Sequence, residues 1–191
     1  MLEHIIVSKT RRKILELFFL NPNRNFYLRQ VVREIGEEIN AVKRELDLLT
    51  KAKVLLKEKR LNKVFFQVNK NWFFFQEFLH IVWKNSIYAQ TFLKNISRIG
   101  KIKFLVFSEK FAKKSPIKET EVYILFVGTV VIPEISQIIA KFEKDYGREI
   151  NYTVMSKEEF EFRKKNKDPF LWSFLTQPKI LIIGKEEELM K

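Results

Sequence analysis

The segment "EEINAVKRELDLLTKAKVL", residues 37–55, constrains the fold more than any other stretch of the chain. On an α-helix, its apolar residues Val42, Leu46 and Leu49 fall on one stripe, which is stable only when it is buried against a core. A second stripe on another face carries polar and charged side chains: Asn40, Lys43, Arg44, Asp47 and Lys51. The sequence therefore predicts a helix that is packed on one side and exposed on the other.

Two shorter helices are expected before this one. The segment "SKTRRKILELFFLNP" (8–22) starts with Ser8, a good N-cap residue, and its apolar repeat stops at Pro22. The segment "FYLRQVVREIG" (26–36) has an apolar stripe and carries Gly36 just past its end. Two short helices joined by a glycine-containing turn, the later one with a basic outer face, are typical of a helix-turn-helix.

A basic hairpin is expected next, in "VLLKEKRLNKVFFQVN" (54–69). Residues 54–57 and 64–68 alternate as strands do, and "KRLNK" (59–63) is polar and basic enough to form the turn between them. Three helices followed by such a hairpin are the order of elements in a winged helix.

On these residues, and above all on "NAVKRELDLLTKAKVLLKEKRLNKVFFQVN", residues 8–69 resemble the winged helix-turn-helix domain of small bacterial and archaeal transcriptional regulators. The resemblance implies double-stranded DNA as partner, with α-helical residues in the major groove and the hairpin on phosphates. Asn and Arg can make bidentate contacts to bases, and neutralised phosphates release counterions. The expected DNA-binding residues are Asn40, Lys43, Arg44, Asp47, Lys51, Lys57, Lys59, Arg60 and Lys63. Two alternatives stay open: a merely solvated helix, or a winged helix that binds protein.

The distribution of charge favours nucleic acid as the partner. The formal net charge is +13, and it is concentrated in one half of the chain. Residues 1–100 hold 19 Lys/Arg against 9 Asp/Glu, whereas residues 101–191 hold 17 against 14. A surplus confined to one half indicates that this half meets a polyanion, and charge kept only for solubility does not predict the asymmetry.

The middle of the chain, "NWFFFQEFLHIVWKNSIYAQTFLKNISRIG" (71–100), is apolar on more than one side of any helix drawn through it. Such a helix needs several partners to bury it. It packs either between two domains of one chain or in a homodimer interface, which would present two recognition helices to two half-sites. Both interpretations remain open, and an aromatic cofactor box is the weakest of the three.

The second half alternates strands and helices, which indicates an α/β domain with a small mixed sheet. Strands are expected at 101–108, 121–128, 148–156 and 179–184, and residues 109–120 are expected to form a loop. A helix over 132–147 would start near Pro133 and end at Gly147, and a second would begin at the capping pattern of Ser156 and Glu159.

This order, with "EVYILFVG" as second strand and "GREINYTVMSKEEF" after it, resembles the minimal nucleotidyltransferase domain. In active members a Gly-Ser turn holds nucleotide phosphates, and three aspartates on two strands bind magnesium. The resemblance places the turn at Ser108, Glu109 and Lys110, the paired strand aspartates at Glu121 and Tyr123, and the third aspartate at Asn151.

The residues at these positions do not suit the family's chemistry. A carboxylate at the turn repels phosphate, and one carboxylate of three is too few for a two-metal site. We therefore expect no catalytic residues, no metal, no cofactor and no enzyme activity. The rival readings are an active nucleotidyltransferase that modifies a protein or RNA partner, and an antitoxin-like interaction module.

Composition excludes several other classes. Without cysteine the chain has no disulfide or thiolate chemistry, and two histidines make a His-based metal site a poor expectation. No apolar run reaches the roughly 20 residues of a membrane helix, and the start lacks the order of a signal peptide. The expectation is a cytoplasmic α+β protein with a winged helix (1–70), an aromatic helical linker (71–100) and a nucleotidyltransferase-like domain (101–191).

Overall fold

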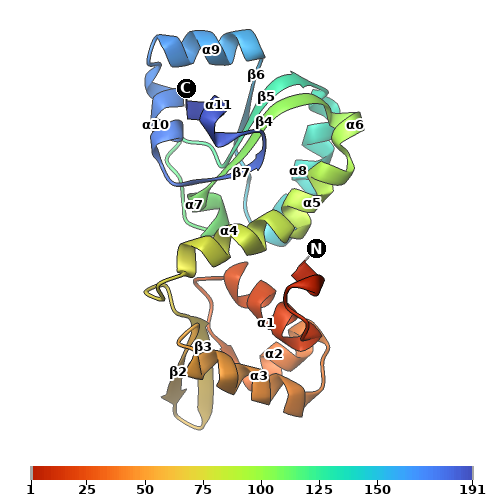
Figure 1. Cartoon of the computed structure of the whole chain (residues 1–191), viewed down its shortest axis with the longest axis vertical. Helices are drawn as coiled ribbons and strands as arrows, with labels where there is room; N and C mark the ends of the chain where they lie inside the picture. Colours follow the sequence, from red (N-terminus) through yellow and green to blue (C-terminus); the bar gives the residue numbers. More distant parts are fainter. Residues whose placement is uncertain (1, 191) are drawn as a thin grey trace. The chain divides into compact units, whose positions relative to one another are not determined.

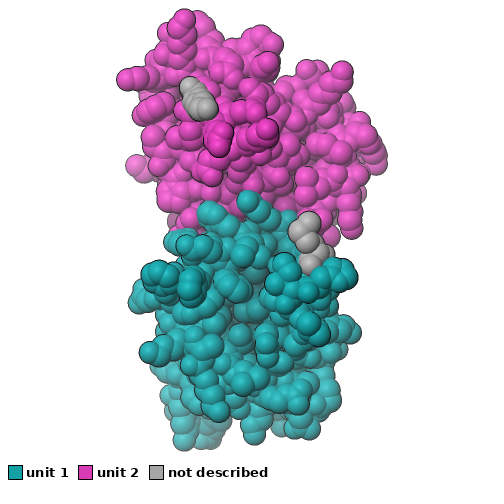
Figure 2. All heavy atoms as spheres, viewed as in Figure 1, with its two compact units in different colours: residues 1–86 teal, residues 87–191 magenta. Residues whose placement is uncertain are grey.

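The structure is a computed structural model that describes residues 2–190, in which eleven α-helices, one 3-10 helix and two small sheets form a mixed α+β fold. The chain divides into two compact units, residues 1–86 and 87–191 (Figure 2). This division falls inside the segment 71–100 that the sequence analysis treated as one linker. No helix within residues 2–190 combines the length and the apolar character needed to cross a membrane.

The first unit contains three helices, a three-stranded sheet and a fourth helix. Its elements are η1 (Leu2–His4), α1 (Lys9–Phe19), β1 (Phe26–Tyr27), α2 (Leu28–Ile35), α3 (Ile39–Lys51), β2 (Leu55–Arg60), β3 (Lys63–Val68) and α4 (Phe75–Asn85). The predicted N-cap of α1 and the predicted glycine at the end of α2 are confirmed, but α1 ends at Phe19, before Pro22, and the helix expected over 26–36 begins only at Leu28, because Phe26 and Tyr27 form β1. Ser8 caps α1 by accepting a hydrogen bond from the Arg11 N–H, and Gly36 ends α2 with a left-handed φ of 62°.

The small sheet has the strand order β1-β3-β2, with both pairs antiparallel (Figure 1). Its turn is shorter than predicted. Strands β2 and β3 pair as far as Arg60 and Lys63, so only Leu61 and Asn62 form the turn, and Leu61 takes a positive φ of 50°. The expected turn over 59–63 is therefore wrong. Lys59, Arg60 and Lys63 are strand residues, and their exposed charges are the reason that the sequence indicated a turn there.

The core of this unit lies between the helices and one face of the small sheet. The apolar stripe predicted for α3 is buried, as Val42, Leu46 and Leu49 expose 6% or less. Phe26 of β1 packs edge-on against Phe18 of α1, with ring centroids 5.2 Å apart. Burial of the α3 stripe stabilises the packing of α3 in this core, and the contact between Phe18 and Phe26 joins α1 to the sheet.

The second unit is built on a four-stranded mixed sheet. Its elements are α5 (Ile87–Lys94), α6 (Ile96–Ile99), β4 (Gly100–Ser108), α7 (Glu109–Ala112), β5 (Ile124–Val130), α8 (Ile132–Tyr146), β6 (Tyr152–Met155), α9 (Lys157–Lys165), α10 (Pro169–Thr176), β7 (Lys179–Ile183) and α11 (Glu186–Met190). The strand order is β6-β5-β4-β7. Strands β5 and β6 are parallel, because α8 carries the chain back between them, and β4 is antiparallel to both of its neighbours.

Helices cover both faces of this sheet (Figure 1). Phe104 and Val106 of β4 point to one face, where they join a core with residues of α9, α10 and α11. Phe107 points to the other face and lies edge-on to Phe92 of α5, which in turn contacts Phe142 of α8. The second unit is therefore a three-layer arrangement with its own core, which fixes the ends of the strands.

Three predictions for this half need correction. The residues after β4 were expected to form a loop, but Ser108 caps the short helix α7 by accepting from the Phe111 N–H. The first three residues of the strand expected over 121–128, which include Glu121 and Tyr123, lie outside β5, which runs from Ile124 to Val130. The third strand is also shorter than expected, because residues 148–151 approach the sheet through only one backbone bond, from the Tyr123 N–H to the Asn151 carbonyl.

Candidate functional site

Helix α3 presents an exposed polar stripe. Asn40, Lys43, Arg44 and Lys51 are exposed, and Asp47 is half-buried. The buried apolar stripe on the other side of α3 holds the helix in place, so these side chains face away from the core. The structure thus brings together the five helical residues that the sequence analysis selected.

The beginning of α3 is closed by an acidic cap. The Glu38 side chain accepts a hydrogen bond of 2.9 Å from the Ala41 N–H, and backbone N–H groups at Asn40 and Ala41 lower the pKa of this carboxyl. A carboxylate at this place satisfies donors that a phosphate would otherwise use at a helix N-terminus. An anion that approached α3 would therefore meet its side chains rather than its N-terminal amides.

A buried ion pair fixes α3 to α1. Glu45 exposes only 4% of its surface; its carboxylate accepts 2.8 Å hydrogen bonds from the Ser8 hydroxyl and the Arg11 Nε. Burial alone would raise the pKa of Glu45, but the bonds from Arg11 and Ser8 outweigh it, and the pKa is lowered. Sequence reasoning missed this residue, although a signal was present: Glu45 stands on the apolar stripe three residues after Val42.

The hairpin carries its cations on two different faces. Lys57 and Lys59 lie opposite Phe66 and Val64 of β3, on the sheet face that also carries the buried Leu55. That face packs on the helices near the base of the hairpin, and β2 contacts α3 directly (Figure 1). Both lysines are exposed because the strands extend beyond the core.

Arg60 and Lys63 lie on the opposite face, where side chains of the same unit engage them. Arg60 donates to Glu58 at 2.7 Å and lies over the Phe65 ring, and Lys63 lies over the Tyr27 ring at 4.9 Å. The four hairpin cations that the sequence analysis grouped are therefore not equivalent. Two are engaged by a neighbouring acid or ring, and two are not.

Uncompensated charge distinguishes the surface formed by α3 and the hairpin, which we call the α3–hairpin surface. None of its five exposed cations forms a salt bridge with any residue in the described range 2–190: Lys43, Arg44, Lys51, Lys57 and Lys59. The charge of Arg44 helps to lower the pKa of Glu38 and of Glu45, but none of the five is held in an ion pair. A group of exposed cations of this kind attracts polyanions over a distance of about 10 Å at ordinary ionic strength. The arrangement can hold phosphates, and Asn40 and Arg44 can reach base edges.

The second unit gathers the other predicted positions at one end of its sheet. The Ser108 N–H donates to the Tyr123 carbonyl, and the Tyr123 N–H donates to the Asn151 carbonyl, both at 2.8 Å. These bonds place the three residues side by side at the ends of β4, β5 and β6. Glu109 follows Ser108 in α7 and pairs with Lys113, and its N–H donates to the Pro178 carbonyl.

Glu121 is neutralised within this cluster. Lys110 Nζ lies 2.6 and 2.8 Å from its two carboxylate oxygens, and the Lys118 N–H donates to one of them at 3.0 Å. The hydrogen bond from Lys110, followed by that from Lys118, lowers the pKa of Glu121. The Glu121 N–H also donates to the Lys118 carbonyl, which closes a turn. This turn explains why Glu121 is not a strand residue.

Tyr123 is buried in an aromatic cluster rather than aimed at Glu121. Its ring exposes 2%, packs against Phe111 and Tyr146, and donates its hydroxyl proton to the Ser115 carbonyl at 2.9 Å. Tyr146 in turn donates to the Phe111 carbonyl, and burial raises its pKa. The position that the resemblance assigns to a second acidic ligand is thus occupied by a side chain with its own packing and hydrogen bond.

The donor set does not fit the magnesium that the family resemblance implies. Magnesium prefers several anionic oxygens around it, but Glu121 already accepts three hydrogen bonds and the Tyr123 hydroxyl is engaged. Within residues 2–190 no group of three or more His, Asp or Glu side chains is placed to hold a metal ion. No catalytic step through a metal is derived for this cluster.

No protein-family model matches the chain, and no curated protein matches it. Among solved structures, the chain is similar to human N-acetylserotonin methyltransferase in complex with SAM, at 15% identity and a TM-score of 0.31. The match covers 62% of this chain and 36% of that one, so the chain spans little more than a third of its length. A similarity this low carries no argument about fold or function.

Proposed function

We propose that the chain is a cytoplasmic transcriptional regulator that binds double-stranded DNA through a winged helix formed by residues 1–70. Helix α3 would enter the major groove, and Lys57 and Lys59 would contact phosphates beside it. The observation that carries the proposal is the α3–hairpin surface, where five exposed cations have no salt bridge to any described residue. The order of helices and hairpin and the positive charge of this half support it.

A duplex-binding titration at two salt concentrations tests the proposal. We expect fluorescence anisotropy to report binding that weakens steeply with salt, because each phosphate contact contributes a slope of about 0.9 in log Kd against log salt. Replacing Lys43 and Arg44 together by Ala should reduce that slope by about 1.8 if both contact phosphate, and should weaken binding at least tenfold. The double variant Lys141→Ala, Lys144→Ala on α8 removes the same charge elsewhere and serves as the control.

Two outcomes reject DNA binding. One is the absence of salt-dependent binding to any duplex, including a random pool, and the other is unchanged binding by the Lys43 and Arg44 double variant. If the control variant weakens binding as much as the α3 variant, the affinity comes from net charge and not from α3. A pull-down partner whose binding depends on Lys43 and Arg44 in the absence of DNA would favour the interaction-module alternative.

For the second unit we propose a nucleotidyltransferase-like fold without transferase activity. Its support is the order β4–α7–β5–α8–β6 together with the closed Lys110–Glu121 pair at the end of the sheet. We expect no magnesium-dependent transfer of label from radiolabelled nucleotides to protein or RNA. Transfer that is abolished by Glu121→Ala would instead establish the enzyme alternative.

A homodimer that presents two copies of α3 remains part of the proposal. It is supported by exposed aromatic side chains just before α4: Phe73 exposes 87% and Phe74 50% of their surfaces. Large apolar groups that stay exposed in one chain are typical of association surfaces. Sedimentation equilibrium should show a dimer that Phe73→Ser weakens, and a monomer at all concentrations would remove this part of the proposal.

A further inference from the structure

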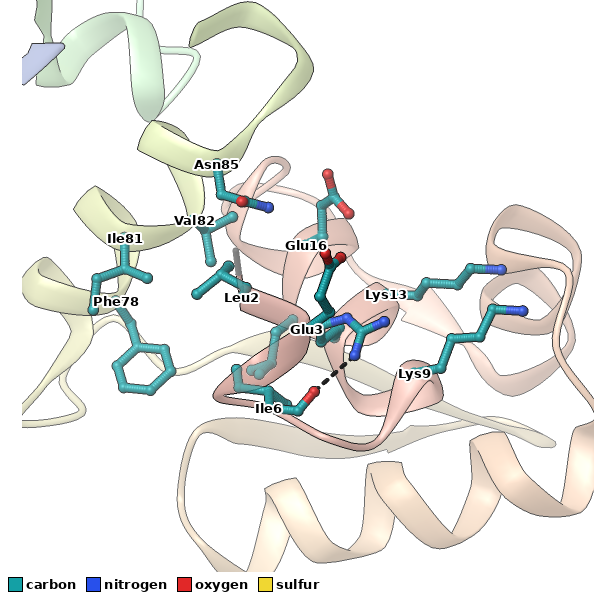
Figure 3. A pocket seen from close by; sticks show the side chains of 12 residues that line it. Leu2, Glu3, Ile6, Lys9, Lys13, Glu16, Phe78, Ile81, Val82 and Asn85 are labelled. Atoms are coloured by element: carbon teal, nitrogen blue, oxygen red, sulfur yellow. Dashed lines mark hydrogen bonds between the residues drawn. The ribbon is translucent and has the colours of Figure 1, made fainter. Parts of the chain in front are cut away.

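The first unit contains a cavity that the proposed function does not use. It has a volume of about 240 Å³ and lies between η1, α1 and α4 (Figure 3). Half of its twelve lining residues are apolar: Leu2, Ile6, Leu15, Phe78, Ile81 and Val82. A cavity with such a wall gains free energy when an apolar group replaces water inside it.

The cations at the rim are already engaged. Arg12 donates to the Ile6 carbonyl at 2.8 Å, an interaction drawn in Figure 3. Lys13 Nζ lies 2.7 Å from the Ile35 carbonyl and 2.6 Å from a Glu37 oxygen, and Lys9 pairs with the same carboxylate at 3.2 Å. These bonds direct all three positive groups to protein acceptors, so the cavity offers little to an anionic ligand.

Glu16, an acidic residue at the rim, differs from these cations. Glu16 of α1 lines the cavity together with Asn85 of α4, and both are drawn on the same side of it in Figure 3. The Glu16 carboxylate has no hydrogen bond or ion pair to a residue in the described range 2–190. The residue remains exposed, yet nearby protein atoms displace enough water to raise its pKa. Glu3 of η1 adds a second carboxylate to the lining, with His4 beside it at 3.8 Å.

We infer that this cavity binds a small amphipathic monoamine, with its apolar body between α1 and α4 and its ammonium group at Glu16. An ammonium group supplies the ionic partner that Glu16 lacks, and Asn85 offers an amide oxygen as a further acceptor. An aromatic or branched aliphatic body matches the wall formed by Phe78, Ile81 and Val82. The inference does not depend on DNA binding, since it concerns a cavity away from the α3 stripe.

Isothermal titration calorimetry on the full chain tests the inference with three probes of one shape and different charge. The probes are 2-phenylethylamine, the neutral 2-phenylethanol and the anionic 3-phenylpropionate. We expect the amine to bind, the alcohol to bind roughly tenfold more weakly because it lacks the charged hydrogen bond, and the carboxylate to give no measurable heat. Binding of the alcohol or carboxylate as tight as that of the amine, or no binding of the amine, overturns the inference.

Three variants locate the site. Glu16→Gln should weaken the amine roughly tenfold and remove its advantage over the alcohol. Ile81→Trp fills the cavity from an exposed position of α4 and should abolish binding of all probes. Glu77→Gln removes an exposed carboxylate of α4 outside the cavity and should change nothing. Circular dichroism checks that each variant is folded, and amine binding that Glu16→Gln and Ile81→Trp leave unchanged also overturns the inference.

Discussion

The α3–hairpin surface and the cluster at the end of β4, β5 and β6 differ in whether their charged side chains form ion pairs. On the α3–hairpin surface, five cations are exposed and form no salt bridge with any residue from 2 to 190. In the cluster, Lys110 lies within 2.8 Å of both oxygens of Glu121, and Lys113 pairs with Glu109. One region has exposed cations without an ion pair, and the other pairs its charges within the chain.

The exposed cations of the first region are accessible to an external anion, whereas the charged groups of the second region are already paired. Uncompensated charges attract an external counterion at no loss of existing bonds, whereas a ligand at Glu121 would first have to displace an ammonium group and a backbone amide. A resemblance to a binding site or a catalytic site is thus not sufficient. A charged side chain at a position that the resemblance indicates can bind a ligand readily only if it is not already held in an ion pair of the chain.

The largest effect is expected when the buried ion pair between Glu45 of α3 and Arg11 of α1 is broken. Glu45→Ala should lower the free energy of unfolding by about 2–3 kcal/mol, because it removes two hydrogen bonds to a buried charged group. Urea unfolding followed by circular dichroism measures the loss. Glu34→Ala, an exposed change on α2, should stay within about 0.5 kcal/mol. An equally small loss for Glu45→Ala would show that packing alone positions α3.

A second change sharpens the distinction between the two faces of the hairpin. Lys57→Ala combined with Lys59→Ala should weaken duplex binding roughly tenfold and reduce the salt slope by up to about 1.8. Arg60→Ala combined with Lys63→Ala should have a smaller effect, since these cations already engage Glu58, Phe65 and Tyr27. Anisotropy titrations of both pairs decide the matter, and equal effects would contradict the assignment of faces.

A third change removes the ion pair between Lys110 and Glu121. Lys110→Met should lower the free energy of unfolding by about 1–2 kcal/mol at neutral pH, because the ionised Glu121 loses its main partner. In the wild type, the pKa of Glu121 is lowered, so its contribution is fully present above the ordinary carboxyl pKa and is lost as the pH falls through the lower folded value. The variant should therefore lose less stability than the wild type on acidification below about pH 4.5. Parallel acid dependences would reject the pairing.

The smallest expected effect concerns the tip of the hairpin. Leu61 holds a left-handed φ of 50° while its side chain is 94% exposed. Leu61→Gly should raise the free energy of unfolding by up to about 1 kcal/mol, because glycine adopts this conformation without strain. Thermal unfolding measures the gain. A loss of stability would mean that the turn adopts another conformation in solution.

Local signals in the sequence were enough to predict the start of α1, the end of α2 and the buried face of α3. Ser8 and Gly36 act as caps through bonds to residues a few positions away, and the buried stripe of α3 follows from helical spacing alone. The mixed sheet was likewise foreseen from the alternation of strands and helices. Winged-helix and nucleotidyltransferase-like assignments stay predictions.

The remaining features depend on distant pairs or on short backbone detail. Glu45 meets Ser8 and Arg11 across more than thirty positions, so no local pattern gives their geometry. Lys110 and Glu121 are eleven residues apart, and their pairing requires both α7, expected as loop, and the turn closed by Lys118. The two-residue turn at Leu61 escaped notice because bulky residues seldom adopt a positive φ.

The Lys110 ammonium behaves as a cation that cannot diffuse away. A dissolved metal ion occupies a site in proportion to its concentration, but a tethered group is held beside Glu121 at a high and constant effective concentration. Chelators or changes in divalent ion supply should leave this end of the sheet unaltered. A group of the chain itself thereby holds the turn at Glu121 in place.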